Sequence, residues 1–502
     1  MFQVIKLGEQ DNIAVCPMEI PKDSIIETYN IKSCNKIPQG HKISIKEIKK
    51  GEKIYKYGQI IGEAIKDIKI GDHVHEHNLS FIEFQRNNLQ NTNTKKNLNY
   101  DHSVPKSFDG YKRESGKIGT RNYIGLLSTV NCSATVVKKI ADNINNYLSE
   151  NNYESIDGAV CLKHSSGCGM NTNGYGMSTF HRTIEGFKNH PNFSYVFVIG
   201  LGCECAQISL FQNNKSSNVV YLNIQDEGGT KKIINKCSRM IVDMLPKANN
   251  IKRTSISVKE LAVALQCGGS DSYSGITANP ALGYASDLLI AKGGSTILAE
   301  TPEIYGAEHL LKERVIENLV KEKLEKHITW WENYTKINGS SMDNNPAPGN
   351  KKGGITTILE KSLGAVAKGG KSPLVDVIDY GESIQKKGFN FMNSPGYDPV
   401  SVTGQVAAGA NIICFTTGRG SCFGYKPVPS IKIATNTNMY NRMEEDMDIN
   451  SGTIMDGIES IEENGIKIYN NIIAVASGKK SKSEINGYGD DEFNPWVIGA
   501  TL

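Results

Sequence analysis

Residues 261–280 read LAVALQCGGSDSYSGITANP, and this stretch indicates the fold class of the larger part of the chain. The apolar run 261–265 is typical of a buried strand, and the polar, glycine-rich segment 266–280 is typical of a loop that enters a helix. Its side chains offer hydroxyl, carboxylate and amide groups, so Ser270, Asp271 and Asn279 are candidate substrate-binding residues. The stretch therefore predicts a ligand-binding loop at the end of a strand.

The same arrangement of an apolar run and a polar loop recurs along the chain. It is found at residues 123–130, 157–164, 195–200, 295–300 and 412–417. Strands that alternate with helices predict parallel sheets, in which ligands bind at the carboxyl ends of the strands. Because the six loops carry Cys, His, Glu, Asp or Arg side chains, we expect them to line one shared cleft.

Residues 1–80 have a different pattern, in which short β-type runs alternate with glycine turns and no helical period is seen. This pattern predicts a small all-β module. It ends in HVHEHN, where His75 and His77, extended by His73, would share one face of a strand. They could face a metal ion or an anionic substrate, and the alternative is a pair of exposed edge histidines.

The remaining organisation follows from composition. Residues 81–108 are polar and rich in asparagine, which predicts a flexible linker. We expect a central α/β domain at residues 109–255 and a C-terminal α/β domain at residues 256–502. Residues 345–354, NPAPGNKKGG, are interrupted by proline and glycine, so we expect neither helix nor strand there and place Asn350 and Lys351 on a stiff loop.

Two metal sites are compatible with the pattern. Cys168, Cys203 and Cys267 each stand beside glycine after an expected strand, and three converging thiolates could hold an iron–sulfur cluster. Buried structural cysteines are the alternative interpretation. In the rival site, oxygen and nitrogen ligands bind one divalent ion such as Fe(II) or Mn(II). Its ligands would come from His75, His77, Asp271 and Glu300.

Other side chains are candidates for catalysis and for holding an anion. His164, Glu204 and Lys351 are candidate acid–base groups, together with His75 and His77. The planar guanidinium of Arg419 can hold a carboxylate in two bonds, and Lys432 and Asn350 are further candidates for substrate binding.

Composition excludes several classes of protein. The formal net charge is only +3, so we expect no nucleic-acid partner, and no run of 18 apolar residues predicts a membrane span. The 11 cysteines are scattered through a chain of 502 residues, which favours reduced thiols over a disulfide framework. We therefore expect a cytoplasmic protein that acts on a small molecule.

Long motifs resemble those of the altronate/galactarate dehydratase family, whose first module is a SAF (β-clip) domain. They include KIGTRNYIG at 117–125, IGLGCE at 199–204, ETPEIYGAEHLL at 300–311, FTTGRG at 415–420 and VPSIKIATNT at 428–437. The resemblance covers nearly the whole chain. It implies a Rossmann-like C-terminal domain, Fe(II) with Mn(II) as a substitute, and a homodimer.

The resemblance also implies a reaction, the removal of water from a sugar acid. We expect D-altronate to give 2-dehydro-3-deoxy-D-gluconate, with galactarate, giving 5-dehydro-4-deoxy-D-glucarate, as the alternative and a non-catalytic sugar-acid binding protein as a remote one. In our hypothesis His164 takes the α-proton. His75 or His77, carried by the first module, then protonates the departing β-hydroxyl.

Overall fold

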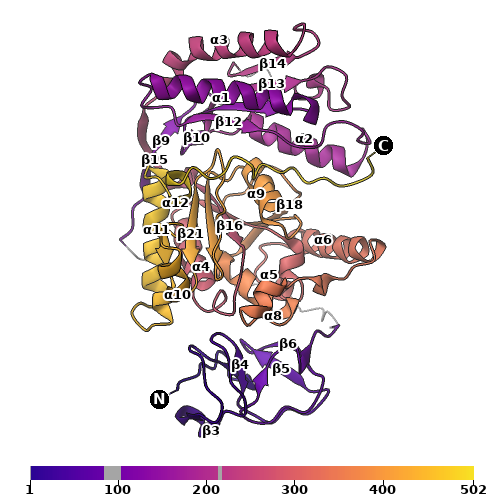
Figure 1. Ribbon diagram of the computed structural model, residues 1–502, viewed down its shortest axis with the longest axis vertical. Coiled ribbons are helices and arrows are strands. Elements are labelled where there is room, and N and C mark those ends of the chain that lie inside the picture. Colours follow the sequence, from indigo (N-terminus) through magenta and orange to yellow (C-terminus); the bar gives the residue numbers. More distant parts are fainter. Residues whose placement is uncertain (1, 84–102, 213–216, 502) are drawn as a thin grey trace.

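The computed structural model describes residues 2–83, 103–212 and 217–501, and it consists of three bodies stacked along the longest axis (Figure 1). The order along that axis differs from the order along the chain. The body formed by the C-terminal half lies in the middle, with the first module at one end and the second body at the other. The first module therefore meets the C-terminal body directly. The expected linker falls largely on residues outside the described ranges.

The first module consists of small antiparallel sheets, which confirms the predicted all-β module. One sheet has the order β1-β4-β7 and another the order β5-β6-β8, with β2 and β3 forming a separate pair. The strands are β1 (Ile13–Val15), β2 (Ile25–Ile26), β3 (Ile31–Lys32), β4 (Lys42–Ser44), β5 (Lys53–Lys56), β6 (Gln59–Ala64), β7 (His73–Val74) and β8 (Leu79–Ser80).

The second body is built on a four-stranded parallel sheet with the order β12-β11-β13-β14. Helices α1 and α3 pack on one face of this sheet, and α2 packs on the other face, toward the C-terminal body. A small antiparallel sheet, β10-β9-β15, lies beside it. The elements are β9 (Ser107–Lys112), β10 (Ile118–Gly119), β11 (Tyr123–Ser128), α1 (Ala134–Glu150), β12 (Gly158–Leu162), α2 (Tyr175–Lys188), β13 (Phe193–Gly200), β14 (Val219–Asn223), α3 (Thr230–Asn249) and β15 (Arg253–Ser257).

The C-terminal body contains a seven-stranded parallel sheet with the order β18-β19-β17-β16-β20-β21-β22. The chain leaves β16 first toward β17 and later toward β20, so the sheet is doubly wound and its switch point lies at β16, where such sheets bind ligands. Its strands are β16 (Ala262–Cys267), β17 (Ser295–Leu298), β18 (Leu374–Ile378), β19 (Phe389–Met392), β20 (Ile412–Thr417), β21 (Ser430–Ala434) and β22 (Ile449–Asn450).

Helices cover both faces of this sheet. They are α4 (Ala278–Ala291), α5 (Glu308–Lys312), α6 (Asn318–Ile337), α7 (Pro348–Lys352), α8 (Ile358–Val366), α9 (Asp398–Ala407), α10 (Thr437–Arg442), α11 (Ile461–Ala476) and α12 (Lys482–Ile485). Among the described residues, no helix is both long enough and apolar enough to cross a membrane.

The predicted strands are confirmed. The six polar loops divide between two sheets, since three follow β11, β12 and β13 and three follow β16, β17 and β20. One expectation is wrong. Residues 345–354 do contain a helix, α7, which starts at Pro348. Proline is tolerated there because the first helical N–H has no intrahelical partner.

Candidate active site at the junction with the first module

Three histidines of the first module form a group that could hold a metal ion. Ligand atoms of His41, His73 and His75 all lie within 4.8 Å of one another. His41 Nε2 donates to the carbonyl of Lys352, at 3.2 Å, so its Nδ1 is left to accept from His73 Nε2 at 3.0 Å. The Nδ1 atom of His75 is buried and has no hydrogen-bond partner among the described residues. Such an unpaired nitrogen fits a ligand that is still to bind.

Strand pairing brings these histidines together. β4 and β7 are antiparallel with Ile43 opposite His73, so His41, just before β4, reaches the level of His75. The strand ends at Val74, and a turn follows in which the N–H groups of Asn78 and Leu79 both donate to the carbonyl of His75. His77 is therefore exposed at the rim, with its ring centroid 5.2 Å from that of His73.

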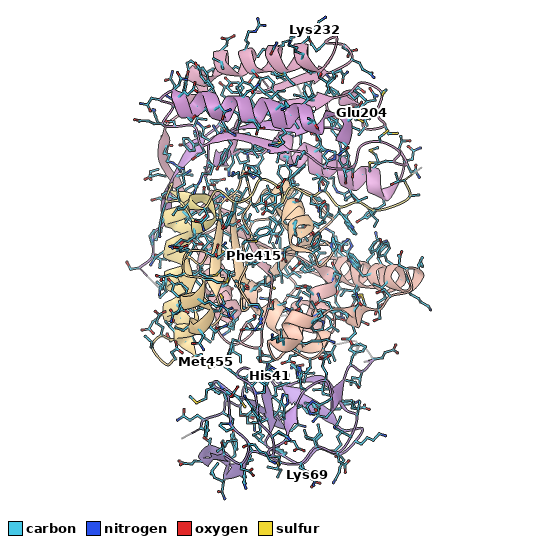
Figure 2. The ribbon with its side chains drawn as sticks, viewed as in Figure 1. His41, Lys69, Glu204, Lys232, Phe415 and Met455 are labelled. Atoms are coloured by element: carbon cyan, nitrogen blue, oxygen red, sulfur yellow. The ribbon has the colours of Figure 1, made fainter. Side chains whose placement is uncertain are left out.

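His41 was missed because the sequence does not reveal which strand pairs with which. The signal that could have found it is the PQGHKIS segment, whose glycine turn leads into a β-type run. Figure 2 places His41 on the side of the first module that faces the C-terminal body.

The C-terminal body contributes a second group, made of Cys267, Glu300 and Glu303, whose ligand atoms also lie within 4.8 Å of one another. The register explains it. Leu265 of β16 pairs with Leu298 of β17, and Cys267 and Glu300 each lie two residues further on, at the same carboxyl edge of the sheet. The sequence had pointed to Glu300 together with Glu303 as candidate acid–base and metal-binding groups, and the structure adds Cys267 to them.

Lysines and Asp398 surround this second group. Lys368 Nζ lies 2.9 Å from Cys267 Sγ, and Lys361 Nζ lies 2.6 Å from Glu303 Oε1. Asp398 lies against Gly268, where a Cβ atom would be only 2.3 Å from its Oδ2, so this close approach requires glycine. Cations, carboxyl groups and a thiol thus share one buried pocket.

The carboxyl groups of this pocket differ in charge state. Burial, together with the charge of Glu303, raises the pKa of Glu300 well above its usual value. Burial alone would also raise the pKa of Glu303, but Lys361 outweighs it and holds the pKa of Glu303 below its usual value. Burial and the charge of Glu303 raise the pKa of Asp398 to about 7. Burial thus pushes the pKa values of Glu300 and Asp398 upward while Lys361 pulls that of Glu303 downward, and such a separation is typical of groups that act as acid and base.

Glu300 has two further unusual properties. Both its carboxyl oxygens are buried without a hydrogen-bond partner among the described residues. Its backbone φ is +74°, a left-handed conformation that costs a non-glycine residue about 1–3 kcal/mol. Strain and an unpaired acid at the carboxyl edge of the sheet are typical of a functional site.

A buried charged triad joins the first module to the C-terminal body. Lys42 Nζ lies 2.9 Å and Lys56 Nζ lies 2.7 Å from the carboxylate of Glu360. All three side chains are at most 2% exposed. Burial lowers the pKa of Lys42 to about 8. Despite burial, the two lysines hold the pKa of Glu360 below its usual range, so the triad carries a net positive charge at neutral pH.

Several expected ligand-binding residues instead organise the loop after β16. The carboxylate of Asp271 accepts hydrogen bonds from the loop N–H groups of Tyr273 and Ser274 and from the side chains of Thr435 and Asn436. The amide of Asn279 donates to the Gly364 carbonyl and accepts from Thr416.

Asn350 and Ser270 lie together in the same region. Asn350 donates to the carbonyl of Ser270 at 2.8 Å and accepts from the Ala347 N–H at 3.0 Å. Ser270 itself is buried and lines the same gap as Lys56 and Cys267. The loop residues are thus close to the candidate site, with their polar groups largely occupied.

The expected basic residues differ in their surroundings. Lys351 Nζ forms an ion pair of 2.5 Å with Glu76 of the first module, beside the histidines. Arg419 is exposed and pairs with no carboxylate of the described residues. Lys432 is buried, donates to the Ser421 carbonyl at 3.1 Å and lies 5.3 Å from the ring centroid of Tyr488. Of the three, Lys351 alone contacts the first module in the described contacts.

His164 and Glu204 belong to the second body, and Figure 2 shows Glu204 on the far side of the C-terminal body from His41. His164 Nε2 donates to the Ser128 carbonyl at 2.8 Å, and its Nδ1 accepts from the Ser166 N–H at 3.1 Å. Burial lowers the pKa of His164 to about 4. Glu204 accepts from the Gly202 N–H and the Thr129 hydroxyl. Both side chains therefore hold loops of the second body together.

The three expected cysteines are divided between the bodies. Cys168 and Cys203 are exposed in loops of the second body, whereas Cys267 is buried in the C-terminal body beside Lys368. Among the described residues, the metal-capable group that contains Cys267 includes neither of the other two cysteines.

Family models match all three bodies. The altronate/galactarate dehydratase SAF domain matches residues 2–81, the second domain of D-galactarate dehydratase/altronate hydrolase matches residues 110–249, and the C-terminal domain of D-galactarate/altronate dehydratase matches residues 258–501.

Curated relatives align over nearly the whole chain. The chain is 34% identical to an altronate dehydratase of Bacillus subtilis, and the alignment covers all of both chains. It is 36% identical to a galactarate dehydratase (L-threo-forming) of Escherichia coli over 95% of this chain and 93% of that protein. It is 33% identical to an altronate dehydratase of Escherichia coli, again over the full length of both.

The fold, the acid-rich pocket and these similarities define a sugar-acid dehydratase, which is a hydro-lyase. The chain belongs to the altronate/galactarate dehydratase family and carries its SAF domain at the N-terminus.

Proposed function

We propose that this chain removes water from D-altronate to give 2-dehydro-3-deoxy-D-gluconate, at the junction between the first module and the carboxyl edge of the seven-stranded sheet. Full-length similarity to two altronate dehydratases supports this substrate. The galactarate dehydratase that aligns at 36% identity makes galactarate the second candidate.

One observation carries the proposed location. The buried carboxyl oxygens of Glu300 have no hydrogen-bond partner among the described residues, although an unpaired buried polar group costs about 1–3 kcal/mol. A hydroxyl group of a sugar acid would satisfy them. The location is also suited to an anion, since the buried triad Lys42–Glu360–Lys56 carries a net positive charge close by.

The pocket can supply the two proton transfers of a dehydration. Asp398, with a pKa of about 7, accepts the proton from the α-carbon. Glu300, whose pKa is raised by burial and by the charge of Glu303, donates its proton to the β-hydroxyl, which leaves as water. The enol that remains then tautomerises to the 2-keto-3-deoxy acid. Lys361 keeps the neighbouring Glu303 ionised, which helps to hold Glu300 in its protonated form.

The residues at the junction fit a divalent ion. We propose that His41, His73 and His75 hold Fe(II), with Mn(II) as a substitute, because imidazole nitrogen is a suitable ligand for both and the Nδ1 of His75 is unpaired. Burial lowers the pKa of His73 and of His75 to about 3, so both rings are neutral and able to bind. When bound, the ion supplies a Lewis acid that draws charge from the substrate carboxylate.

A side-by-side assay tests the proposal. The protein is purified without oxygen, loaded with Fe(II), and assayed for 2-keto-3-deoxy acid on D-altronate and on galactarate. Turnover of D-altronate alone supports the proposed substrate. Turnover of galactarate alone replaces it with the second candidate, and turnover of neither acid by metal-loaded protein contradicts the proposal.

His164 remains testable as an alternative base. Its ring nitrogens are both engaged by backbone groups, so His164→Asn should lower stability and leave the turnover of the folded protein nearly unchanged. A loss of 10²-fold or more in turnover, in folded and metal-loaded protein, would restore it as the base.

The assembly and the location belong to the same proposal. We propose a homodimer in the cytoplasm, as the family resemblance implies. Light scattering on the metal-loaded protein distinguishes a dimer from a monomer.

A further inference from the structure

Three exposed cysteines that are far apart in the sequence lie at one edge of the four-stranded sheet of the second body. Cys132 follows β11, Cys168 follows β12 and Cys203 follows β13. These strands are parallel neighbours in the order β12-β11-β13, so their carboxyl ends reach the same edge. Cysteine is among the most often buried residues, and three exposed ones on adjacent loops are unusual.

Hydrogen bonds tie each pair of these loops together close to the cysteines. The Asn131 N–H donates to the Ser166 carbonyl at 3.1 Å, which links the Cys132 and Cys168 loops. The Ala206 N–H donates to the Gly167 carbonyl at 3.0 Å, which links the Cys168 and Cys203 loops.

The third link joins the Cys132 and Cys203 loops. There the Thr129 hydroxyl donates to Glu204 Oε1 at 2.7 Å. Every link lies within three residues of both cysteines that it connects. The three thiols are therefore presented by one rigid set of loops.

The surroundings of the three cysteines are compatible with a metal cluster. Helix α1 starts two residues after Cys132, and the positive end of its dipole stabilises negative charge there. Gln225 Nε2 donates toward Cys203 Sγ at 3.5 Å, and such hydrogen bonds to sulfur are common at iron–sulfur clusters. A hollow of about 630 Å³ opens beside Cys168, between its loop and residues 497–501, and gives a small molecule access to the edge.

We infer that Cys132, Cys168 and Cys203 bind an iron–sulfur cluster that leaves one iron without a cysteine ligand. A single ion does not fit the three sulfurs as they stand. The three sulfurs are not among the groups of ligand atoms within 4.8 Å of one another in the described residues, as one zinc ion would need. In a cluster each thiolate binds a different iron, so the sulfurs stand further apart.

This inference does not depend on the proposed function, and its test needs no substrate. The full-length protein is treated without oxygen with ferrous iron, sulfide and a reducing thiol, then desalted, and its iron, acid-labile sulfide and visible spectrum are measured. The wild type should contain iron and labile sulfide in similar amounts, with a broad thiolate-to-iron absorption band. Cys132→Ser, Cys168→Ser and Cys203→Ser should each lose most of the iron, the sulfide and the band.

Two control variants sharpen the test. Cys422→Ser removes another exposed cysteine, and Cys267→Ser removes the buried cysteine of the C-terminal body, and both should retain the cluster. Wild-type protein without labile sulfide would overturn the inference. So would full retention in any of the three serine variants, or loss in Cys267→Ser.

A measurement on the wild type guards against variants that fail to fold. Alkylation is compared before and after cluster loading, by mass spectrometry of the peptides. Loading should protect Cys132, Cys168 and Cys203, while Cys34 and Cys422, which are exposed elsewhere, should react equally in both states. Equal alkylation of all five cysteines after loading would contradict the inference.

Discussion

Lys56 of the first module and Glu360 of the C-terminal body lie 2.7 Å apart and are both buried, so the contact between the two bodies depends on charged groups that are cut off from water. Lys42 binds the other oxygen of the same carboxylate. Glu360 on α8 thus binds two lysines of the module that carries the histidines, in addition to the contacts of His41 and Glu76 with α7.

Replacing Glu360 with glutamine should therefore undock the first module. Removing one partner of a buried ion pair costs about 3–5 kcal/mol, because the remaining charges stay buried without compensation. We expect a lower first unfolding transition in urea and faster proteolysis between residues 81 and 108. Glu19→Gln is the matched control, since Glu19 and Lys36 form an exposed pair worth about 0–1 kcal/mol. Equal stability of the two variants would contradict the role of the triad.

Stability should fall on acidification from pH 7 toward pH 5. Burial, with smaller contributions from neighbouring positive charges, lowers the pKa of His73 and of His75 to about 3. In the unfolded chain these rings titrate near 6.5, so between pH 6.5 and pH 3 the unfolded state binds more protons and acid favours it.

Thermal unfolding of chelator-treated protein at a series of pH values measures this effect. His73→Asn combined with His75→Asn should flatten the dependence but not abolish it, because burial also lowers the pKa of His164 and of His190 to about 4. An unchanged pH dependence in the double variant would show that these two histidines ionise normally in the folded protein.

His41 should be required for metal binding, although the sequence alone did not identify it as a metal ligand. His41→Ala removes one of three nitrogens that lie within 4.8 Å of one another, whereas His77→Ala removes an exposed ring at the rim. Titration with Mn(II), followed by calorimetry, should show a large loss of affinity for the first variant and little change for the second. A loss of equal size in both would favour a site that includes His77.

Glu300→Gln should abolish most activity without unfolding the protein. Burial raises the pKa of Glu300 and so favours its neutral form, and the amide of glutamine keeps the shape of that form but has no acidic proton to donate. We expect turnover to fall by about 10²- to 10⁴-fold, the usual contribution of a general acid. Glu313→Gln, an exposed change at the end of α5, is the control and should leave turnover unchanged. Turnover of Glu300→Gln within a few-fold of the wild type would exclude Glu300 as the acid.

Part of the site could be predicted from the sequence, because the ends of strands and the loops that follow them are local features. The runs before Cys267 and Glu300 were recognisable as strands, and both residues lie at the expected carboxyl ends. The sequence could not show whether Cys267 lies near Cys168 and Cys203. The sheet to which a strand belongs is decided by contacts between segments that are far apart in sequence.

The sequence by itself determined the family, the all-β first module, the parallel α/β bodies and the positions of the polar loops, since periodicity and glycine placement act within a few residues. Tertiary structure alone decided which loops meet. Strand register placed His41 beside His75, docking through Glu360 set them against the sheet edge, and burial raised the pKa of Glu300. Each of these depends on the loss of water around side chains from distant segments, and that is settled only when the bodies pack together.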